Sequence, residues 1–450
     1  MLEDADNRDG TRIGSGKVPR SRWIETLCRH FVWLTAVACL IGYVYAYTEG
    51  RAGTPIRSDA FSYYVYLPAW ILYHDPSLQA FADDCCGGEF PNWSGIARWP
   101  HGHRWVDPHP IGEAILMAPF FLAAHALTRW SNLDPDGLTI YYQHAAGLAG
   151  LFYVCVGLWF LRRLLLRYFN PAVVLATLAV MLTGTSLFHY ATFDSAWSHA
   201  FSFALVSAFL ERVDVWKPDA DDTGRAAIAI GAIAGLIALV RHPNVLLPVC
   251  FVAAVVVSRR EHLGAVIRQS AIAAAVATAV IMPQLWIYHS ATRQWFISAY
   301  GTQGHFTFGS PHIISVLASP QKGVFFWAPV LVIALAGFTL MPQTLARRWR
   351  APSLVYLAVH TYLIASWFEW QFGASYGHRG FVDVYPLFAL GLASLFARIA
   401  PRPVLRASLA TVCVLLCALS LFQMLQYWHG VLPMSDTTWT QYRGLFLEPW

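Results

Sequence analysis

The residue best placed to do chemistry is Asp59, about ten residues beyond the first apolar run, which ends near Tyr47. The aromatic stretch that follows it directly, 60–73, has the character of an amphipathic helix lying in a membrane interface. A carboxylate held there, near lipid headgroups but sheltered from bulk water, can act as a general base. The alternative is that Asp59, together with Ser58, only caps the helix that starts at Ala60.

A second charged segment, 107–113, has the sequence Asp-Pro-His-Pro-Ile-Gly-Glu. Its prolines fix the start of a helix, and its glycine permits close backbone approach. Free amides at a helix start, beside His109, would suit a phosphate, and Glu113 adds a second acid. A plain proline-rich helix start is the alternative, but it explains the prolines and not the charge density.

Two turns between apolar runs carry single ionisable residues. Asp194 lies in the turn 192–199, where its simplest role is to cap the next helix. Arg241 follows Val240 at a break between two apolar runs. A buried arginine at an external helix end needs an anion, which could be a phosphate or a carboxylate such as Asp59 or Asp194. A purely structural ion pair is the alternative for Arg241.

Segments 319–329 and 367–380 combine aromatic residues and glycines with the cations Lys322 and Arg379. Aromatic rings stack on sugars, and cations contact phosphates, so both segments suit a phosphorylated sugar. The aromatic belt of a membrane protein would explain the tryptophans but not the two cations.

Composition excludes an ordinary soluble enzyme. Of 450 residues, 56% are hydrophobic and only 13% are charged, against about 25% charged in soluble domains. Apolar runs of roughly 17–22 residues match the thickness of a bilayer. The net charge of +5 is spread over short loops, so no nucleic-acid partner is predicted.

The cysteines do not form a disulfide framework. Cys85 and Cys86 are adjacent, and together with His101 and His103 they match no zinc spacing, which favours a vicinal thiol or disulfide over a metal site. No cofactor is predicted from these residues, although a divalent metal remains open.

The predicted fold is all-α, a polytopic transmembrane bundle of about eleven spans. A polar cytoplasmic tail, 1–28, precedes the membrane domain, 29–425, which contains a long first external loop, 48–139; a short external tail, 426–450, follows. The predicted spans are 29–47, 140–162, 171–190, 196–212, 226–241, 244–258, 271–290, 324–341, 352–368, 382–398 and 405–425.

The apolar run 111–128 could also span, and loop charge decides against it. If this run stays at the outer surface, about two thirds of the 31 Lys and Arg residues lie on the cytoplasmic side, as the positive-inside rule requires. The run is then a re-entrant or interfacial helix. The N-terminus is predicted to lie inside and the C-terminus outside, with every candidate residue named above on the outer face.

With these segments in view, the chain resembles the polyprenyl-phosphate-dependent glycosyltransferases of the GT-C superfold, in particular the bacterial aminoarabinose, galacturonic acid and mannosyl transferases. The resemblance runs from Asp59 to about Ala397. It rests on short motifs in a common order: Ser58-Asp59 before Tyr63-Tyr64, His109-Pro110-Ile111-Gly112, Asp194, Ser319-Pro320 with Gly323 and Phe326-Trp327-Ala328-Pro329, and Gly377-His378-Arg379 before Pro386.

The resemblance implies an inverting transfer at the outer face of a bacterial cytoplasmic membrane. Asp59 would be the base that activates an acceptor hydroxyl on an envelope lipid, glycan or protein. The lysine that contacts the lipid phosphate in some relatives is replaced here by His109. The implied contacts to the donor phosphate and sugar are therefore His109, Arg241, Lys322, Arg379, Asp194, Tyr63, Tyr64 and Glu113.

Two other classes of function were weighed. A transporter or flippase of lipid-linked sugars needs polar residues across the bilayer midplane, whereas the predicted helix centres here are apolar. A non-catalytic protein of envelope assembly would leave Asp59 and Arg241 without a purpose.

Overall fold

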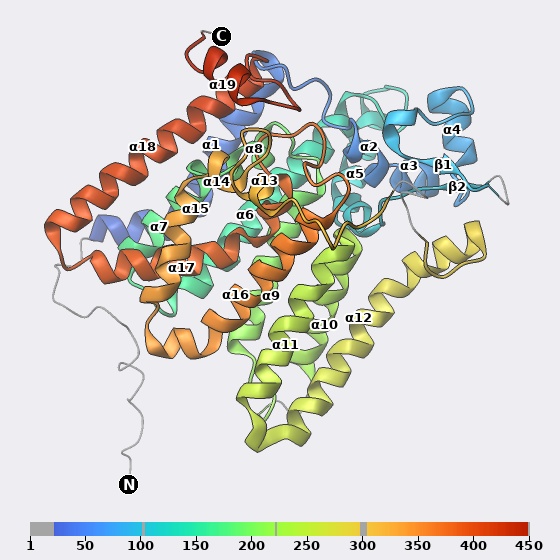
Figure 1. Cartoon of the computed structure of the whole chain (residues 1–450). Coiled ribbons are helices and arrows are strands. Elements are labelled where there is room, and N and C mark those ends of the chain that lie inside the picture. Colours follow the sequence, from blue (N-terminus) through green and yellow to red (C-terminus); the bar gives the residue numbers. More distant parts are fainter. Residues whose placement is uncertain (1–21, 101–103, 221–222, 298–303, 449–450) are drawn as a thin grey trace.

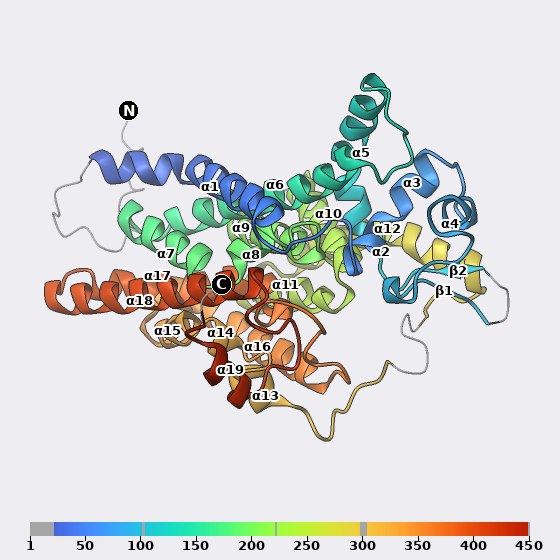
Figure 2. The same ribbon diagram turned by 90° about the horizontal axis from the view of Figure 1, so that it is seen from above.

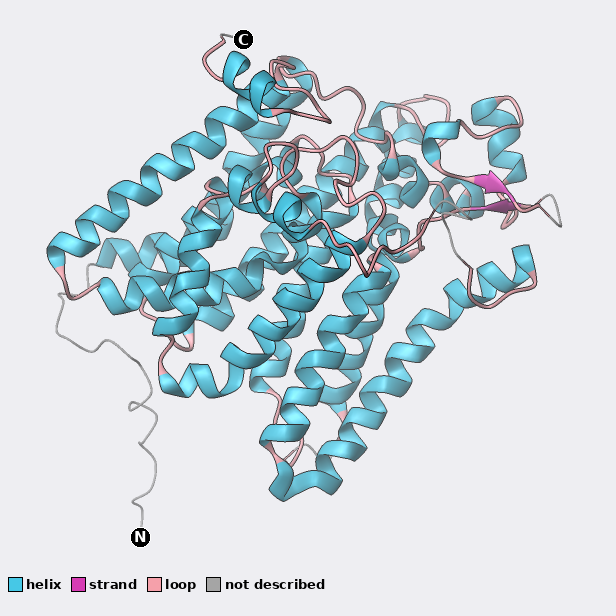
Figure 3. Ribbon diagram, in the orientation of Figure 1, coloured by secondary structure: helices cyan, strands magenta, loops and turns pink. Residues whose placement is uncertain are grey.

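A computed structural model describes residues 22–100, 104–220, 223–297 and 304–448. Within these ranges the regular structure is almost entirely helical (Figure 3). The strands there are β1 (Ala97–Arg98) and β2 (Trp105–Val106), an antiparallel hairpin that pairs Ala97 with Val106. The helical class predicted from the sequence is confirmed for the part of the chain that the structure describes.

All eleven apolar runs fold as helices, and several are broken by a turn. In chain order they are α1 (Arg22–Thr48), α6 (Ile140–Leu166), α7 (Pro171–Thr183) with α8 (Leu187–Thr192), α9 (Ser198–Val215), α10 (Arg225–Val240), η2 (His242–Val245) with α11 (Leu246–Ser258), η3 (Arg260–His262) with α12 (Leu263–Thr292), α14 (Val324–Trp327) with α15 (Val330–Gly337) and η4 (Phe338–Leu340), α16 (Gln343–Ser366), η5 (Arg379–Val384) with α17 (Tyr385–Ile399), and α18 (Pro403–Trp428).

Five of these helical regions are long and apolar enough to cross a membrane: α1, α6, η3 with α12, η5 with α17, and α18. Large apolar side chains cover the outer faces of α1 and α18; Trp33 is 74% exposed and Val414 is 66% exposed. Continuous exposed apolar surface is unfavourable in water and matches lipid. The structure is therefore compatible with the membrane protein that the composition predicts.

Small residues let the helices approach closely. Gly231 of α10 lies against the backbone of Ala273 of α12; a Cβ atom at Gly231 would meet the Ala273 carbonyl oxygen at 2.3 Å. Gly150 of α6 lies in the same way against Ser195 of the turn before α9. This second contact fixes the position of the turn that contains Asp194.

The long first loop forms α2 (Asp59–Tyr64), α3 (Tyr66–Ile71), α4 (Gln79–Cys86), η1 (Asn92–Ser94), the β hairpin and α5 (Gly112–Trp130). Nearly every side chain from Ala60 to Ala69 is buried. In the stretch 60–73 that the sequence places in a membrane interface, residues 60–69 are buried in the protein and residues 70–73 are partly exposed. In Figure 2, α5 projects from the bundle beside α3.

The remaining helices are α13 (Ile313–Ala318) and α19 (Trp439–Leu445). Thr438 caps α19 through a capping box with Gln441. Cys85 and Cys86 form a disulfide within α4, as the sequence favoured, although in a helix and not in an irregular loop. His101 and His103, and the tail up to residue 21, lie outside the described residues.

The helices place charged residues at two ends of the bundle. In Figure 1, α2 to α5, α8, α14 and α19 lie at the upper end, and the turn between α11 and α12 lies at the lower end. The C-terminal ends of α6 and α9 meet the start of α16, where Arg167 contacts Glu211, and Arg348 donates to the Val213 carbonyl. The end that carries α2 holds Asp59 and most of the candidate residues.

Candidate active site

The centre of the site is an ion pair between Asp59 and Arg379. Asp59 opens α2, and Arg379 opens η5, 320 residues later; Arg379 Nη1 lies 2.7 Å from Asp59 Oδ2. Ser58 adopts a left-handed φ of 50°, a strained conformation that is concentrated at functional sites. Ser58 makes no side-chain capping hydrogen bond, and the Asp59 carboxylate faces Arg379. Asp59 therefore does not act as a helix cap.

Aromatic rings surround the guanidinium of Arg379. It lies 4.7 Å from the Trp197 ring centroid and 5.8 Å from that of Phe372. Arg241 lies 5.9 Å from the same Phe372 ring. Rings over a guanidinium orient it while leaving its edge available for hydrogen bonds. Phe372 thus lies against the guanidinium groups of both arginines.

Asp59 is charged and accessible. Burial raises the pKa of its carboxyl, but the Arg379 charge, aided by two nearby histidines, outweighs burial and brings the pKa below its ordinary value. The Asp59 side chain keeps 29% of its surface exposed, against 11% for Arg379. The carboxylate can therefore be approached by a solute although its partner is held inside the protein.

Arg241 already has a carboxylate partner, Asp383. Its Nε lies 2.7 Å from Asp383 Oδ2, an ion pair without hydrogen-bond geometry at Nε. Asn244 donates to the same oxygen at 2.7 Å, and His199 Nδ1 lies 3.4 Å from the other oxygen. The anion that an arginine at this helix end requires is thus supplied within the chain by Asp383.

Glu113 is a fully buried acid without a partner. Its side chain is 0% exposed, and neither carboxyl oxygen has a hydrogen-bond partner among the described residues. Gly112, the residue before it, lets the start of α5 lie against Leu239 of α10, because a Cβ atom at Gly112 would meet the Leu239 backbone at 2.5 Å. Burial and the nearby Asp59 charge raise the pKa of Glu113 well above its ordinary value. Burial therefore favours the protonated form of Glu113.

The two predicted tyrosines point in different directions from α2. The Tyr63 ring lies 4.4 Å from that of His109. Burial raises the pKa of Tyr63, and the charges of Arg241 and Asp59 also act on its hydroxyl. Tyr64 donates to the Gly137 carbonyl, outside this group. Only Tyr63 faces the site, because successive side chains on a helix point about 100° apart.

His109 is hydrogen-bonded to Ser62 of α2, with 2.8 Å between His109 Nδ1 and Ser62 Oγ. The Ser62 hydroxyl lies 2.5 Å from Asp107 Oδ1. His109 is thus held through hydrogen bonds and by the Tyr63 ring, and its charge contributes to lowering the Asp59 pKa. We name Asp59, Tyr63, His109, Glu113, Arg241 and Arg379 the Asp59 cluster.

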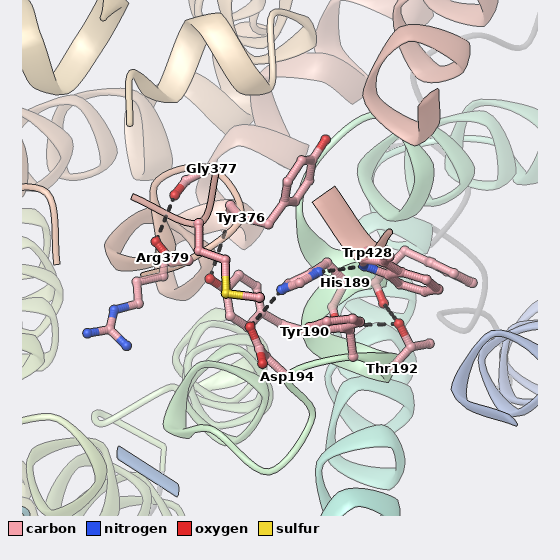
Figure 4. Close-up of polar contacts among 12 residues, drawn as sticks. His189, Tyr190, Thr192, Asp194, Tyr376, Gly377, Arg379 and Trp428 are labelled. Carbon is pink, nitrogen blue, oxygen red and sulfur yellow. Dashed lines mark hydrogen bonds and ion pairs between the residues drawn. The ribbon is translucent and has the colours of Figure 1, made fainter. Parts of the chain in front are cut away.

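Asp194 lies beside this cluster, and both of its carboxylate oxygens have partners within the chain. Arg57 Nη2 lies 2.6 Å from one carboxylate oxygen, and His189 Nε2 lies 2.8 Å from the other. The indole of Trp428 donates to His189 Nδ1 at 2.9 Å. Figure 4 shows Trp428, His189 and Asp194 in a row, with the Arg379 guanidinium directed away from it. Asp194 is therefore not a helix cap; Trp197 occupies the N-cap position of α9.

Lys322 is also beside the cluster. Its ammonium is buried and donates to the backbone carbonyls of Ser375 and Met434, the latter at 2.8 Å. Burial lowers the pKa of Lys322 to about 7, and the positive charge of Arg379 acts in the same direction. Lys322 thus links the loop before Arg379 to the segment that follows α18.

Sequence reasoning did not select four residues that complete this region: Ser62, Asp107, Phe372 and Asp383. Asp383 lay within a predicted span, 382–398, where an ionisable residue is itself a signal of function. The described residues contain no group of three or more His, Cys, Asp or Glu side chains that could hold a metal ion.

Six of the nine predicted site residues form the Asp59 cluster. Asp194 and Lys322 lie beside it and are bonded to other groups of the chain, and Tyr64 lies apart. Compared with known proteins, the chain matches no family model and no curated protein. The chemistry of this region must therefore be argued from its geometry.

Proposed function

We propose that the protein is an inverting membrane glycosyltransferase that uses a polyprenyl-phosphate-linked sugar as donor, as its resemblance to the GT-C enzymes implies. The observation that carries the proposal is the Asp59–Arg379 ion pair, a part-exposed carboxylate beside a cation held by aromatic rings. A base next to a cation is the arrangement that hydroxyl attack and phosphate departure need together.

In this proposal each group has one task. Asp59 accepts the proton of the acceptor hydroxyl, whose oxygen attacks the anomeric carbon. Arg379 stabilises the phosphate that leaves with the electron pair of the broken bond. Glu113, as a neutral acid, donates a hydrogen bond to a sugar hydroxyl or a phosphate oxygen. Arg241 is held by Asp383, so it contributes charge and not direct contact.

The proposal places the Asp59 cluster on the outer face of a bacterial cytoplasmic membrane, with eleven spans. The support is the charge distribution: the basic residues near Arg167 and Arg348 lie at the opposite end of the bundle. Cysteine labelling from outside tests the arrangement. Position 59 should react with an impermeant reagent and position 347 should not. Labelling of both positions from one side would reject this topology.

The activity is tested by incubating the purified protein with a panel of polyprenyl-phosphate sugars and envelope lipids. Transfer of a labelled sugar from at least one lipid phosphate, lost in Asp59→Asn, is the expected result. If the folded protein transfers no sugar from any donor of this class, the proposal is wrong.

A further inference from the structure

The first two turns of α16, at the end of the bundle opposite the Asp59 cluster, have one anchored side and one basic side. The basic side lines a hollow on the surface with Gln343, Ala346, Arg347 and Arg350. Their spacing of three, four and seven residues places them on one side of the helix. On the other side, Leu345 and Trp349 are both 0% exposed. The helix start is therefore held by its apolar side and presents two arginines outward.

These two arginines have no acid as partner. Arg347 is exposed, and within the described ranges no carboxylate forms an ion pair with it or with Arg350. Arg350 Nη2 donates to the Met341 carbonyl at 3.0 Å, and its Nε is buried without a hydrogen-bond partner in the same part of the chain. A carbonyl oxygen satisfies one N–H of a guanidinium and leaves its charge unbalanced.

The acids at this end of the bundle are already shared by other arginines. Glu211 contacts Arg167 and Arg212. Asp214 contacts Arg167 at 2.9 Å and lies 3.8 Å from Arg348. The positive charge on the outward side of the α16 start is therefore in excess, and an anion from outside the chain can balance it.

Beyond Arg350 the outer face of α16 becomes apolar. The exposed residues of the next three turns are Ala351, Leu354, Val355, Ala358, Val359 and Tyr362. Val355 alone keeps 56% of its surface exposed, whereas the polar side chains of Ser353 and His360 are buried on the inward side. A continuous exposed apolar face of this kind matches lipid chains.

The length of this apolar face matches a membrane. From Arg350 to Trp367, the helix is about 25 Å long at 1.5 Å per residue, close to the roughly 30 Å of a bilayer hydrocarbon core. Arginine marks one end of the face, and Tyr362 and Trp367 mark the other, as is typical of the two membrane interfaces. The change at Arg350 therefore lies at the level of the lipid headgroups.

We propose that Arg347 and Arg350 bind the phosphate of an anionic phospholipid whose acyl chains lie along the apolar face 351–362. Guanidinium groups donate paired hydrogen bonds to phosphate oxygens. The headgroup supplies the anion that the chain does not, and the acyl chains cover the apolar face. This site does not depend on the proposed glycosyltransferase activity.

The test titrates the purified full chain in detergent with dioctanoyl phosphatidylglycerol, dioctanoyl phosphatidylcholine or inorganic phosphate, and native mass spectrometry gives the affinity for the first bound molecule. Phosphatidylglycerol should bind most tightly, because it alone combines net negative charge with acyl chains. Each arginine near a membrane surface contributes about fivefold in affinity. Arg347→Gln with Arg350→Gln should therefore weaken phosphatidylglycerol binding about 20-fold and leave phosphatidylcholine binding unchanged.

Two further variants control for loss of charge and for misfolding. Arg129→Gln with Arg443→Gln removes two exposed arginines from α5 and α19, at the end of the bundle that carries α2, and should keep the parent affinity. Arg347→Gln alone removes an exposed side chain and should lower the affinity about fivefold. It keeps the test decisive if the double variant at the α16 start fails to fold.

Four results would overturn the proposal. Equal affinity of the parent for the two lipids would mean that the face binds acyl chains without recognising charge. Unchanged phosphatidylglycerol binding after loss of Arg347 and Arg350 would place the lipid elsewhere. Inorganic phosphate that binds as tightly as phosphatidylglycerol would mean a site for a free anion. A lipid-free dimer that dissociates in the double variant would mean that a second copy of the chain covers this face.

Discussion

Two buried glutamates, one at each end of the bundle, have opposite surroundings. At the end opposite the candidate site, Glu211 is fully buried, and both of its oxygens contact arginines, Arg163 and Arg167 on one side and Arg212 on the other. At the Asp59 end, Glu113 is equally buried and neither oxygen has a described partner. Both oxygens of Glu211 thus have partners, whereas the hydrogen-bonding capacity of Glu113 is unused.

A second acid near each glutamate shows the same difference in hydrogen bonding. Asp214, beside Glu211, contacts Arg167 at 2.9 Å and accepts from the Tyr168 hydroxyl at 2.5 Å. Asp107, near Glu113, leaves Oδ2 without a described partner. Folding alone favours complete pairing of buried polar groups. Glu113 and Asp107 are buried acids with unpaired oxygens, and a ligand could supply the missing partners.

The largest expected effect comes from Asp59→Asn. Asn has nearly the same shape and can accept a hydrogen bond, but it cannot take up a proton at neutral pH. Transfer should fall about 10²–10⁴-fold, while the donor affinity and the melting temperature stay near those of the parent. A steady-state assay with a labelled donor checks this. A rate within a few-fold of the parent would remove Asp59 from the mechanism.

Arg241→Ala should mainly cost stability, because it leaves Asp383 buried and unpaired. Removing one partner of a buried ion pair costs about 3–5 kcal/mol. Asp383→Asn in the same chain should recover much of that loss, since the remaining amide is neutral. Thermal unfolding in detergent of both single variants and the double variant measures the coupling. Independent, additive losses would mean that the ion pair does not hold this region together.

A matched pair of substitutions compares the two buried glutamates directly. Glu211→Gln removes the partner of three arginines and should cost about 1–3 kcal/mol. Glu113→Gln replaces an acid whose protonated form is favoured by burial, so it should change stability little at acidic pH. Equal destabilisation by the two substitutions would show that the two ends do not differ as described.

The pH dependence of Glu113→Gln has a definite sign. The folded state raises the Glu113 pKa above its ordinary value of 4.5, so folding holds a proton that the unfolded chain releases. This contribution to stability is complete below about pH 4.5 and is lost as the pH rises through the folded pKa. Melting temperatures of parent and variant should therefore diverge in favour of Gln as the pH is raised. A constant difference would mean that Glu113 is ionised in the folded protein.

The smallest expected effect is that of Trp428→Phe. This substitution removes the indole donor to His189 and keeps most of the ring. One hydrogen bond is worth about 0.5–1.5 kcal/mol, and catalysis should be nearly unchanged because Asp194 keeps both Arg57 and His189. A large loss of transfer with normal stability would mean that this row belongs to the catalytic machinery.

The sequence predicted the helices well because each apolar run is long and bounded by polar turns. The helical class is confirmed, and each of the eleven apolar runs contains helix in the described residues, of which five helical regions are long and apolar enough to cross a membrane. The aromatic residues of 60–69 are buried within the protein, and Trp70 and Tyr73 are partly exposed. Periodicity cannot distinguish lipid or water from protein as the neighbour of a helix face.

The site was predictable only in part. Asp59 and Arg379 could be proposed from their residue types, but their contact joins positions 320 residues apart, and no local pattern encodes that distance. The partner of Arg241 was sought among Asp59 and Asp194, whereas tertiary packing supplies Asp383. Which carboxylate meets which arginine depends on helix packing, and single-sequence reasoning does not reach that level.

The contacts of Lys322 and Trp428 have a consequence for biosynthesis. The indole of Trp428 reaches back 239 residues to His189, and the Met434 carbonyl reaches back 112 residues to Lys322. The ribosome adds both partners long after the first loop with Asp59 has been made. A chain stopped before α18 would contain every residue of the Asp59 cluster. It would lack the indole that donates to His189 and the Met434 carbonyl that accepts from Lys322.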